Sequence, residues 1–289
     1  MKLLGTTNLK DFTALMRFRR TISKLYRQTR LRPCLPALIV LLAVAPSELF
    51  KAPAEIHPEK GSVVVKDSSG KQRWTADWTV EPATNNGRRA VRFTENGKGR
   101  YSPFTTEVQW SLESVWSADG FYRPLRVDKT YRDSAGKVLA TDKKLFQPAA
   151  MRWERSAAGK KEAKTFSASP DVIAVDGIGL VLRAFPFENR EFSTHLISNE
   201  PRLYDVTFEN RGRERVRVPA GEFDCYRIEA EAHLGVLSLV KPFLAKTTFW
   251  MTVEPPHFWV RYQGYENGRG TPEIVMELTS HERSSASLR

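Results

Sequence analysis

The chain has 289 residues, 41% of them apolar, and two cysteines, Cys34 and Cys225. This composition excludes a wholly disordered chain, a disulfide-rich scaffold and a cysteine-rich zinc protein. The formal charge of +12 comes mostly from the first 45 residues, which hold nine basic side chains and a single acid, Asp11. The remaining 36 basic and 32 acidic residues nearly balance, so no nucleic-acid partner is expected.

Residues 1–50 are predicted to be a basic leader that carries a signal peptide or a membrane anchor. An apolar run of eleven residues ends at Ala45, and a short apolar run after a basic stretch is typical of a secretory signal. Pro46 disfavours cleavage directly after this run, so a later cut near Ala52 or Ala54 and an uncleaved anchor both stay open. We expect an exported protein of the bacterial periplasm or cell envelope, which contacts the membrane through the leader if the leader is uncleaved.

Three details of the leader bear on the export route. Arg19 and Arg20 resemble the twin-arginine export motif, although the apolar run starts about a dozen residues late for that route. Cys34 precedes the apolar run, whereas a lipidated cysteine must follow it, so lipidation is not expected. Met16 is an alternative start that would shorten the leader.

Residues 60–280 are predicted to form a single β-rich domain, because polar and apolar side chains there alternate with a period of two. In the first half, the predicted strands are 73–80, 107–112, 125–132 and 137–141. The turn at 133–136 contains a glycine, which favours a hairpin between the last two strands. The polar stretch 156–164 predicts a loop.

The second half shows a clearer alternation. Its predicted strands are 204–209, 214–218, 226–232, 248–253, 258–264 and 273–278, with turns at 210–212 and 219–222. Pro255 and Pro256 interrupt the pattern, because proline cannot donate to a central ladder. Residues 281–289 predict a flexible tail.

The apolar segment Asp171–Phe185 breaks the strand pattern and predicts helix. Ser169 or Asp171 is a possible cap, and the glycines at 177 and 179 favour two short helical pieces over one long helix. A plug or flap over the sheet and an ordinary core helix both stay open. Together with the strands, this predicts a mainly β fold: an antiparallel curved sheet or half-open β-barrel with a short helical segment packed on or in it.

We predict no catalytic residue, no metal site and no cofactor, because the spacing of the histidines fits no metal motif and no nucleophile elbow or phosphate loop is present. His257, in the turn after the two prolines, is a candidate polar clamp, or it satisfies the backbone groups of that turn. Cys225 is expected to be a small buried apolar residue.

Large aromatic side chains are unusually frequent for a β domain, and two interpretations stay open. The rings fill a solid core, or they line an apolar ligand cavity. On the second interpretation the candidate ligand-binding residues are Trp110, Phe185, Tyr204, Phe208, Trp250, Phe258 and Tyr262.

Several segments of the second half resemble a known family. They are Val218–Glu229 (VPAGEFDCYRIE), Thr248–Met251 (TFWM), Pro255–Tyr262 (PPHFWVRY) and Glu273–Leu278 (EIVMEL), and more loosely Leu182–Phe185. As a set they are similar to the bacterial exported domain-of-unknown-function family 3108. The resemblance implies a shape similar to lipoprotein-localisation carriers, in which an incomplete barrel holds acyl chains beneath a helical lid, and a role outside the cytoplasm without catalysis.

Three functions remain to be weighed. The first is a non-enzymatic envelope protein that binds an apolar ligand, with a lipid, an acyl chain or a lipoprotein as partner. The second is a structural or assembly protein of the envelope without a ligand. The third and least supported is a hydrolase-type enzyme that uses His257 or Cys225.

Overall fold

The alternating segments build one fifteen-stranded sheet in a computed structural model, which describes residues 50–199, 202–233, 247–268 and 270–283. The first eight strands are β1 (Glu59–Asp67), β2 (Gln72–Asn85), β3 (Arg88–Arg100), β4 (Glu107–Ser117), β5 (Arg123–Arg132), β6 (Val138–Gln147), β7 (Ala150–Ala157) and β8 (Lys160–Ser167). The others are β9 (Val172–Ala174), β10 (Glu191–Ile197), β11 (Leu203–Val218), β12 (Gly221–His233), β13 (Thr247–Thr252), β14 (Trp259–Tyr265) and β15 (Glu273–Arg283).

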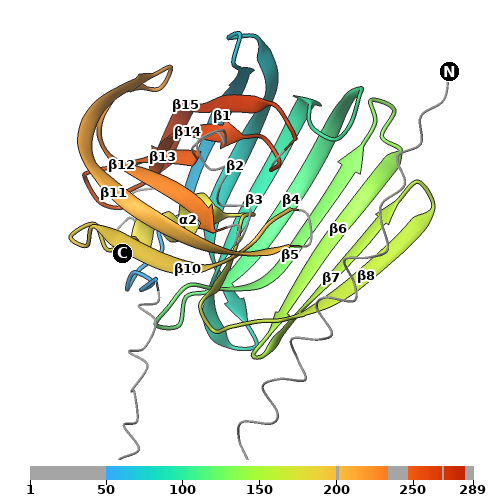
Figure 1. Ribbon diagram of the computed structural model, residues 1–289, viewed down its shortest axis with the longest axis horizontal. Coiled ribbons are helices and arrows are strands. Elements are labelled where there is room, and N and C mark those ends of the chain that lie inside the picture. The colour runs from blue at the N-terminus through green and yellow to red at the C-terminus, as the bar shows by residue number, and fades with distance from the viewer. Residues whose placement is uncertain (1–49, 200–201, 234–246, 269, 284–289) are drawn as a thin grey trace, which may run out of the picture. The chain divides into compact units, whose positions relative to one another are not determined.

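The sheet is a meander whose first and last strands lie side by side. The strand order is β8-β7-β6-β5-β4-β3-β2-β1-β15-β14-β13-β12-β11-β10-β9, and every pair is antiparallel except β9 with β10. The strands from β10 to β15 curl strongly, whereas those from β3 to β8 form a flatter wall (Figure 1). Because β8 and β9 remain as edges, the barrel is not closed, which confirms the predicted open, curved sheet.

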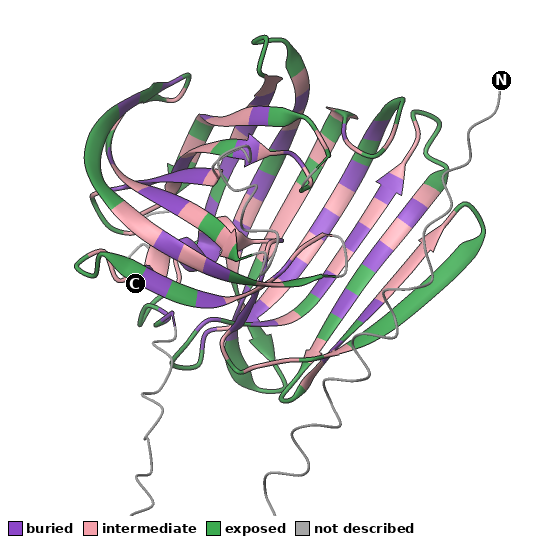
Figure 2. Ribbon diagram, in the orientation of Figure 1, coloured by how far each residue is buried: buried purple, intermediate pink, exposed green. Residues whose placement is uncertain are grey.

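Alternation along the strands determines which side chains are buried. In β4, for example, Val108, Trp110 and Leu112 are buried while the residues between them are not (Figure 2). The same period places Val127, Lys129 and Tyr131 of β5 on the buried face. A lysine therefore occupies a position that the pattern assigns to an apolar residue.

Two predicted loops are wrong. Residues 210–212 do not form a turn, because β11 runs through them and carries a β-bulge there. Gly212 has a φ of +101° and its amide donates to the Asn210 side chain, and the same residue types serve turns and bulges alike. The polar stretch 156–164 is the β7–β8 hairpin, and periodicity missed β8 because this edge strand is exposed along nearly its whole length (Figure 2).

The segment 171–185 forms less helix than predicted. Residues 172–174 are β9, so neither Ser169 nor Asp171 caps a helix. The helical part comprises two short pieces, as predicted, α2 (Ile178–Val181) and η2 (Leu182–Ala184), but they meet directly after Val181 and neither glycine separates them. The buried residues Leu180, Val181 and Leu182 lie inside the curved part of the sheet (Figure 1).

The ends of the domain extend beyond the predicted strands. β15 continues to Arg283, so the first three residues of the predicted tail belong to the sheet and 284–289 lie outside the described residues. The predicted leader, residues 1–50, lies outside them except for its last residue. That residue, Phe50, is buried, and the centre of its ring lies 4.6 Å from that of Phe192. Within the described ranges, no helix is both long and apolar enough to cross a bilayer.

Candidate functional site

A cavity of about 1400 Å³ lies between the flatter wall, the curled strands and the helical segment. Its walls are mostly apolar and combine residues distant in sequence. The first half of the chain contributes Val63, Trp74, Trp78, Val80, Phe93 and Leu112. The second half contributes Leu180, Leu196, Phe208, Phe249, Trp259, Tyr262 and Met276.

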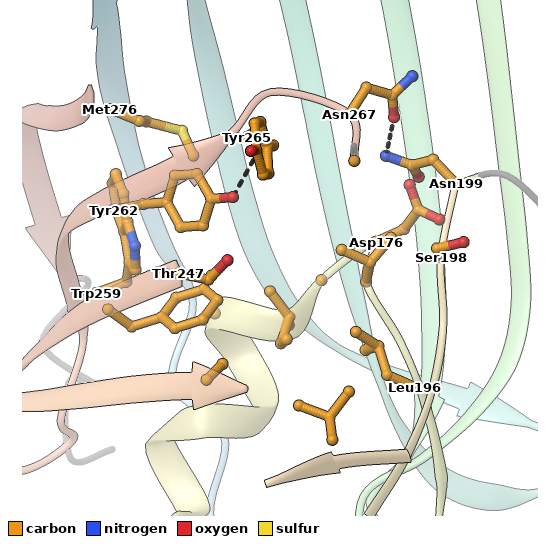
Figure 3. Close-up of a pocket in the computed structure, with 18 of the residues that line it drawn as sticks. Asp176, Leu196, Ser198, Asn199, Thr247, Trp259, Tyr262, Tyr265, Asn267 and Met276 are labelled. Atoms are coloured by element: carbon orange, nitrogen blue, oxygen red, sulfur yellow. Dashed lines mark hydrogen bonds between the residues drawn. The ribbon is translucent and has the colours of Figure 1, made fainter. Parts of the chain in front are cut away.

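One end of the cavity is polar, where the β10–β11 and β14–β15 connections meet. There Asn199 Nδ2 donates to Asn267 Oδ1 at 2.6 Å, and Asn267 in turn donates to the Ser102 carbonyl at 3.3 Å. Ser198 and Asp176 lie beside these two asparagines, while Trp259, Tyr262 and Met276 occupy the opposite side of the view (Figure 3). The cavity therefore combines this polar end with apolar walls, and a second set of charged or polar side chains lines it on β10–β12: Glu191, Glu209, Arg211, Glu229, Glu231 and His233.

A second, smaller cavity of about 80 Å³ adjoins the polar end and shares Lys129, Asp176, Asn199 and Asn267 with the large one. Its remaining lining residues are mostly charged or polar: Asp142, Lys144, Arg155 and Thr271, with Pro103, Val127 and Tyr131. The two cavities together combine an apolar chamber with a polar side chamber.

Four of the five charged residues that line the side cavity form ion pairs. Lys144 of β6 and Asp176, which precedes α2, form a buried salt bridge. Burial would raise the pKa of Asp176, but the ammonium groups of Lys144 and Lys129 hold it below its ordinary value. Arg155 lies 3.9 Å from Asp142, whose pKa is raised by burial.

Lys129 is 6% exposed and lies among aromatic rings. Its Nζ donates to the Tyr101 hydroxyl at 3.0 Å and lies 4.7 Å and 5.3 Å from the ring centres of Tyr101 and Tyr131. Burial opposes the charged form, but the electrostatic effect of these tyrosines, followed by that of Asp176, outweighs burial and raises the pKa of Lys129. The side chain is therefore a buried ammonium that faces both cavities.

Glu95 of β3 is an acidic residue that lines the large cavity on the same wall as Lys129. Its carboxylate accepts a hydrogen bond of 2.8 Å from Trp110 Nε1, and burial raises its pKa. Register pairs Glu95 with Leu112 and Leu112 with Lys129, so Leu112 lies between the two charged residues on one face.

The structure brings three of the seven candidate ligand-binding residues together in the large cavity: Tyr204, Phe208 and Tyr262. Tyr262 also donates from its hydroxyl to the Tyr265 carbonyl at 2.7 Å, and burial raises its pKa (Figure 3). Contact of these three residues with a ligand stays a prediction.

The other four candidates lie away from the lining. Trp110 is buried against Trp74 and Tyr101, and Phe185 is buried with its ring 5.4 Å from that of Phe187. Trp250 is on the opposite face of β13 from the cavity-lining Phe249, under the guanidinium of Arg261. Phe258 stacks on His281 with 4.1 Å between ring centres. Alternation locates rings on faces, but it does not say which face encloses empty space.

His257 also lies outside the lining of both cavities. It sits in the turn after β13 with a φ of +56°, and its Nδ1 is 2.9 Å from the Thr252 carbonyl oxygen. Its ring contacts Phe187 and Tyr226 at centre distances of 4.5 Å and 6.0 Å. The nearest recorded partner is a backbone group of the same turn, which matches the second of the two interpretations offered for this residue.

Lys129, Glu95 and Asp176 were not among the residues expected at a site. A signal was present for Lys129, since it follows Val127 and precedes Tyr131 on an alternating, buried face. Asp176 stands inside an apolar segment, which is a comparable signal. No sequence pattern indicated that these residues line the same cavity.

The described part of the chain contains no group of three or more histidine, cysteine, aspartate or glutamate side chains arranged to hold a metal ion. Cys225 is fully buried, and burial raises the pKa of its thiol to about 12. Such a thiol is protonated at neutral pH and therefore a weak nucleophile.

Comparison with known proteins identifies one family. The model of the family described as "Protein of unknown function (DUF3108)" matches residues 69–279, which is most of the chain. The search of curated proteins finds no match.

Three solved structures are similar to the chain at low scores. A candidate lipoprotein of Parabacteroides distasonis is 14% identical, with 82% of this chain and 99% of that one covered and a TM-score of 0.31. A candidate exported protein of Bacteroides fragilis with a YmcC-like fold is 14% identical, with coverage of 81% and 99% and a TM-score of 0.29. The hypothetical lipoprotein YmcC of Escherichia coli is 8% identical, with coverage of 96% and 98% and a TM-score of 0.26. The expected likeness to lipoprotein-localisation carriers stays a prediction.

Proposed function

The chain belongs to domain-of-unknown-function family 3108, and from its geometry we propose that it is an exported, non-enzymatic envelope protein that shelters an apolar chain in its large cavity. The observation that carries this proposal is the cavity of about 1400 Å³ walled by rings from both halves of the sheet. Pockets for small ligands usually enclose about 300–1000 Å³, so this one has room for a long flexible ligand.

The physical basis is burial of apolar surface. Each CH₂ group transferred from water to such a cavity is stabilised by about 0.8 kcal/mol. An acyl chain of about 14 carbons would therefore gain several kcal/mol after the loss of its own freedom. An empty chamber lined by tryptophan and phenylalanine rings would be less stable, since cavities in apolar cores destabilise a protein.

Export is supported by the leader, in which a basic stretch precedes a short apolar run that ends at Ala45. A sheltered lipid is useful in an aqueous compartment next to a membrane, where free acyl chains would aggregate or insert. The expected partners are a lipid, an acyl chain or a lipidated protein.

Native mass spectrometry of the full-length protein, purified from the bacterial envelope, tests this function. We expect a co-purified mass in the lipid range. The neutral dye 1-N-phenylnaphthylamine should also bind and fluoresce, because its uncharged rings suit the apolar walls.

A matched pair of variants locates the binding. Ala230 of β12 lines the cavity next to Phe208, its paired residue on β11. Ala230→Trp should therefore fill space in the cavity and weaken dye binding. Ala163 lies on the exposed edge strand β8, so Ala163→Trp should leave dye binding unchanged. Equal binding by both variants, together with no lipid mass, would reject the proposal in favour of a structural role in the envelope.

A further inference from the structure

The side cavity contains more positive than negative charge. Three cationic side chains line it, Lys129, Lys144 and Arg155, but only two carboxylates, Asp142 and Asp176. Lys144 is paired with Asp176, and Arg155 with Asp142. Lys129 is the remaining cation, and in the described part of the chain it forms no ion pair with a carboxylate.

This arrangement is unfavourable without a further partner. Desolvating an ammonium group is costly, and buried charges in proteins are normally paired with an opposite charge. The Tyr101 hydroxyl and the two tyrosine faces solvate Lys129 partly, but they carry no formal charge. An anion bound in the side cavity would balance the charge of Lys129.

Glu95 acts on the Lys129 ammonium through space but forms no ion pair with it in the described part of the chain. Its strand is two positions from β5 in the sheet, so the backbones of Glu95 and Lys129 are separated by about 10 Å at the usual strand spacing. Its carboxylate is also engaged by Trp110 Nε1 at 2.8 Å. The protonated form of Glu95 is favoured by burial, as the raised pKa indicates.

The position of Lys129 relates the missing anion to the proposed ligand. Lys129 and Asp176 line both cavities, so a molecule can place a chain in the large cavity and a head group in the small one. A volume of about 80 Å³ suits a single compact head group. The neighbouring side chains of Asn199, Asn267 and Thr271 offer further hydrogen bonds to its oxygen atoms.

We propose that the ligand is an acidic amphiphile, with its apolar chain in the large cavity and its carboxylate or phosphate head group in the side cavity, paired with Lys129. This inference rests on the proposed function, because it specifies which apolar chains the cavity accepts. It predicts discrimination between ligands that share a chain and differ only in the charge of the head group.

The test uses the full-length protein and displacement of 1-N-phenylnaphthylamine by three competitors. Palmitate carries a carboxylate, a palmitoyl lysophosphatidate carries a phosphate, and hexadecanol has a neutral head group. We expect palmitate or lysophosphatidate to displace the dye at a concentration at least about tenfold lower than hexadecanol, the effect of one charge-assisted hydrogen bond. Which of the two acids is stronger distinguishes a fatty acid from a phospholipid as the source of the head group.

Three lysine variants assign the effect to one residue. Lys129→Met should remove the preference for the acids and leave hexadecanol unchanged, and Lys129→Arg should restore most of the preference. Lys143→Met is the control, since Lys143 is 62% exposed on the neighbouring strand β6. A thermal unfolding curve shows whether each variant is folded, and if Lys129→Met does not fold, Lys129→Gln removes the charge while keeping a polar side chain and should lose the same preference.

Three results would overturn the inference, and they differ in what else they overturn. If all three competitors displace the dye equally, the head-group site is wrong while the apolar cavity stands. If neither the dye nor any competitor binds, the proposed function fails as well. A preference for the acids that survives in Lys129→Met would place the anion elsewhere and would also reject the assignment.

Discussion

Arg183 of η2 and Glu59 at the start of β1 form a buried ion pair across 124 positions of sequence, with 2.9 Å between Arg183 Nη1 and the Glu59 carboxylate. His281 Nε2 lies 3.1 Å from the other carboxylate oxygen. Arg183 also lines the large cavity, so this pair fastens the helical segment to the strands at the seam of the sheet. This wall of the cavity is therefore held by a buried ion pair as well as by the buried apolar side chains of the helical segment.

Glu59→Gln should lower the free energy of unfolding by about 3–5 kcal/mol at pH 7, because it leaves the Arg183 charge buried without its partner. Arg183→Met combined with Glu59→Gln should recover part of this loss, since the pair is then removed as a whole. Urea unfolding of the single and double variants measures both values. A single variant as stable as wild type would show that the pair is not a buried contact.

The same pair predicts a pH dependence. Burial would raise the pKa of Glu59, but the His281 hydrogen bond and Arg183 hold it below the ordinary value of 4.5. A lowered carboxyl pKa adds stability that is complete above pH 4.5 and is lost as the pH falls through the folded-state pKa. Thermal unfolding between pH 7 and pH 3 should show a smaller decrease for Glu59→Gln than for wild type.

Gly177 precedes α2 with a φ of +91°, and a Cβ atom there would lie 2.9 Å from Trp116 Nε1. Gly177→Ala combines backbone strain of about 1–3 kcal/mol with this clash. Gly70 has a similar φ of +82° and open space around it, so Gly70→Ala measures the strain alone. We expect Gly177→Ala to lower the unfolding temperature more than Gly70→Ala, and equal effects would contradict the close approach to Trp116.

Phe50 is the first described residue of the domain and belongs to its core. Its side chain is 3% exposed against Phe192, and the Tyr122 amide donates to its carbonyl at 2.8 Å. Phe50→Ala should reduce stability by about 3–5 kcal/mol, as for other buried phenylalanines. Phe121→Ala, at a ring that is 39% exposed, is the control and should have a small effect.

The burial of Phe50 limits where a signal peptide could be cleaved from the chain. A cut near Ala52 or Ala54 would remove a core side chain, so we expect the mature chain to retain Phe50. The mass of the intact protein recovered from the envelope tests this. A mature form that begins after Phe50 and unfolds at the same temperature as the longer chain would contradict it.

Cys225 should be unreactive in the folded protein. It is fully buried and its thiol pKa is raised to about 12, so little thiolate forms at pH 8. In a Cys34→Ser background, Ellman's reagent should react with Cys225 only after urea unfolds the chain. Rapid reaction in buffer would indicate an exposed thiol and reopen a nucleophilic role for it.

Local patterns were sufficient for much of the fold. Alternation identified most strands, because a half-buried strand must place apolar residues at every second position. It failed at β8, where both faces are exposed, and at residues 210–212, where a bulge and a turn use the same residues. The predicted strands also left out β1, β3, β7, β9 and β10. Two short helical pieces were expected and are present, but they meet between residues 181 and 182 and not at the glycines.

The residues that line the large cavity could be predicted only in part from the sequence. Tyr204, Phe208 and Tyr262 were expected to face a ligand and do line the cavity, while Trp250 lies on the opposite face of its strand and Trp110 is packed within the core. Periodicity distinguishes two faces of a strand, but the curvature of the sheet decides whether a face encloses a filled core or a chamber.

The sequence by itself determined an open β-sheet with a short helical segment and a basic leader, because these depend on contacts between near neighbours and on composition. Only the tertiary structure decided that Lys129, Asp176 and Glu95 surround the polar end of an apolar cavity. Lys129 comes from β5, Asp176 from the segment before α2, and Glu95 from β3. They are brought together by pairing between strands distant in sequence, and such pairing leaves no local pattern.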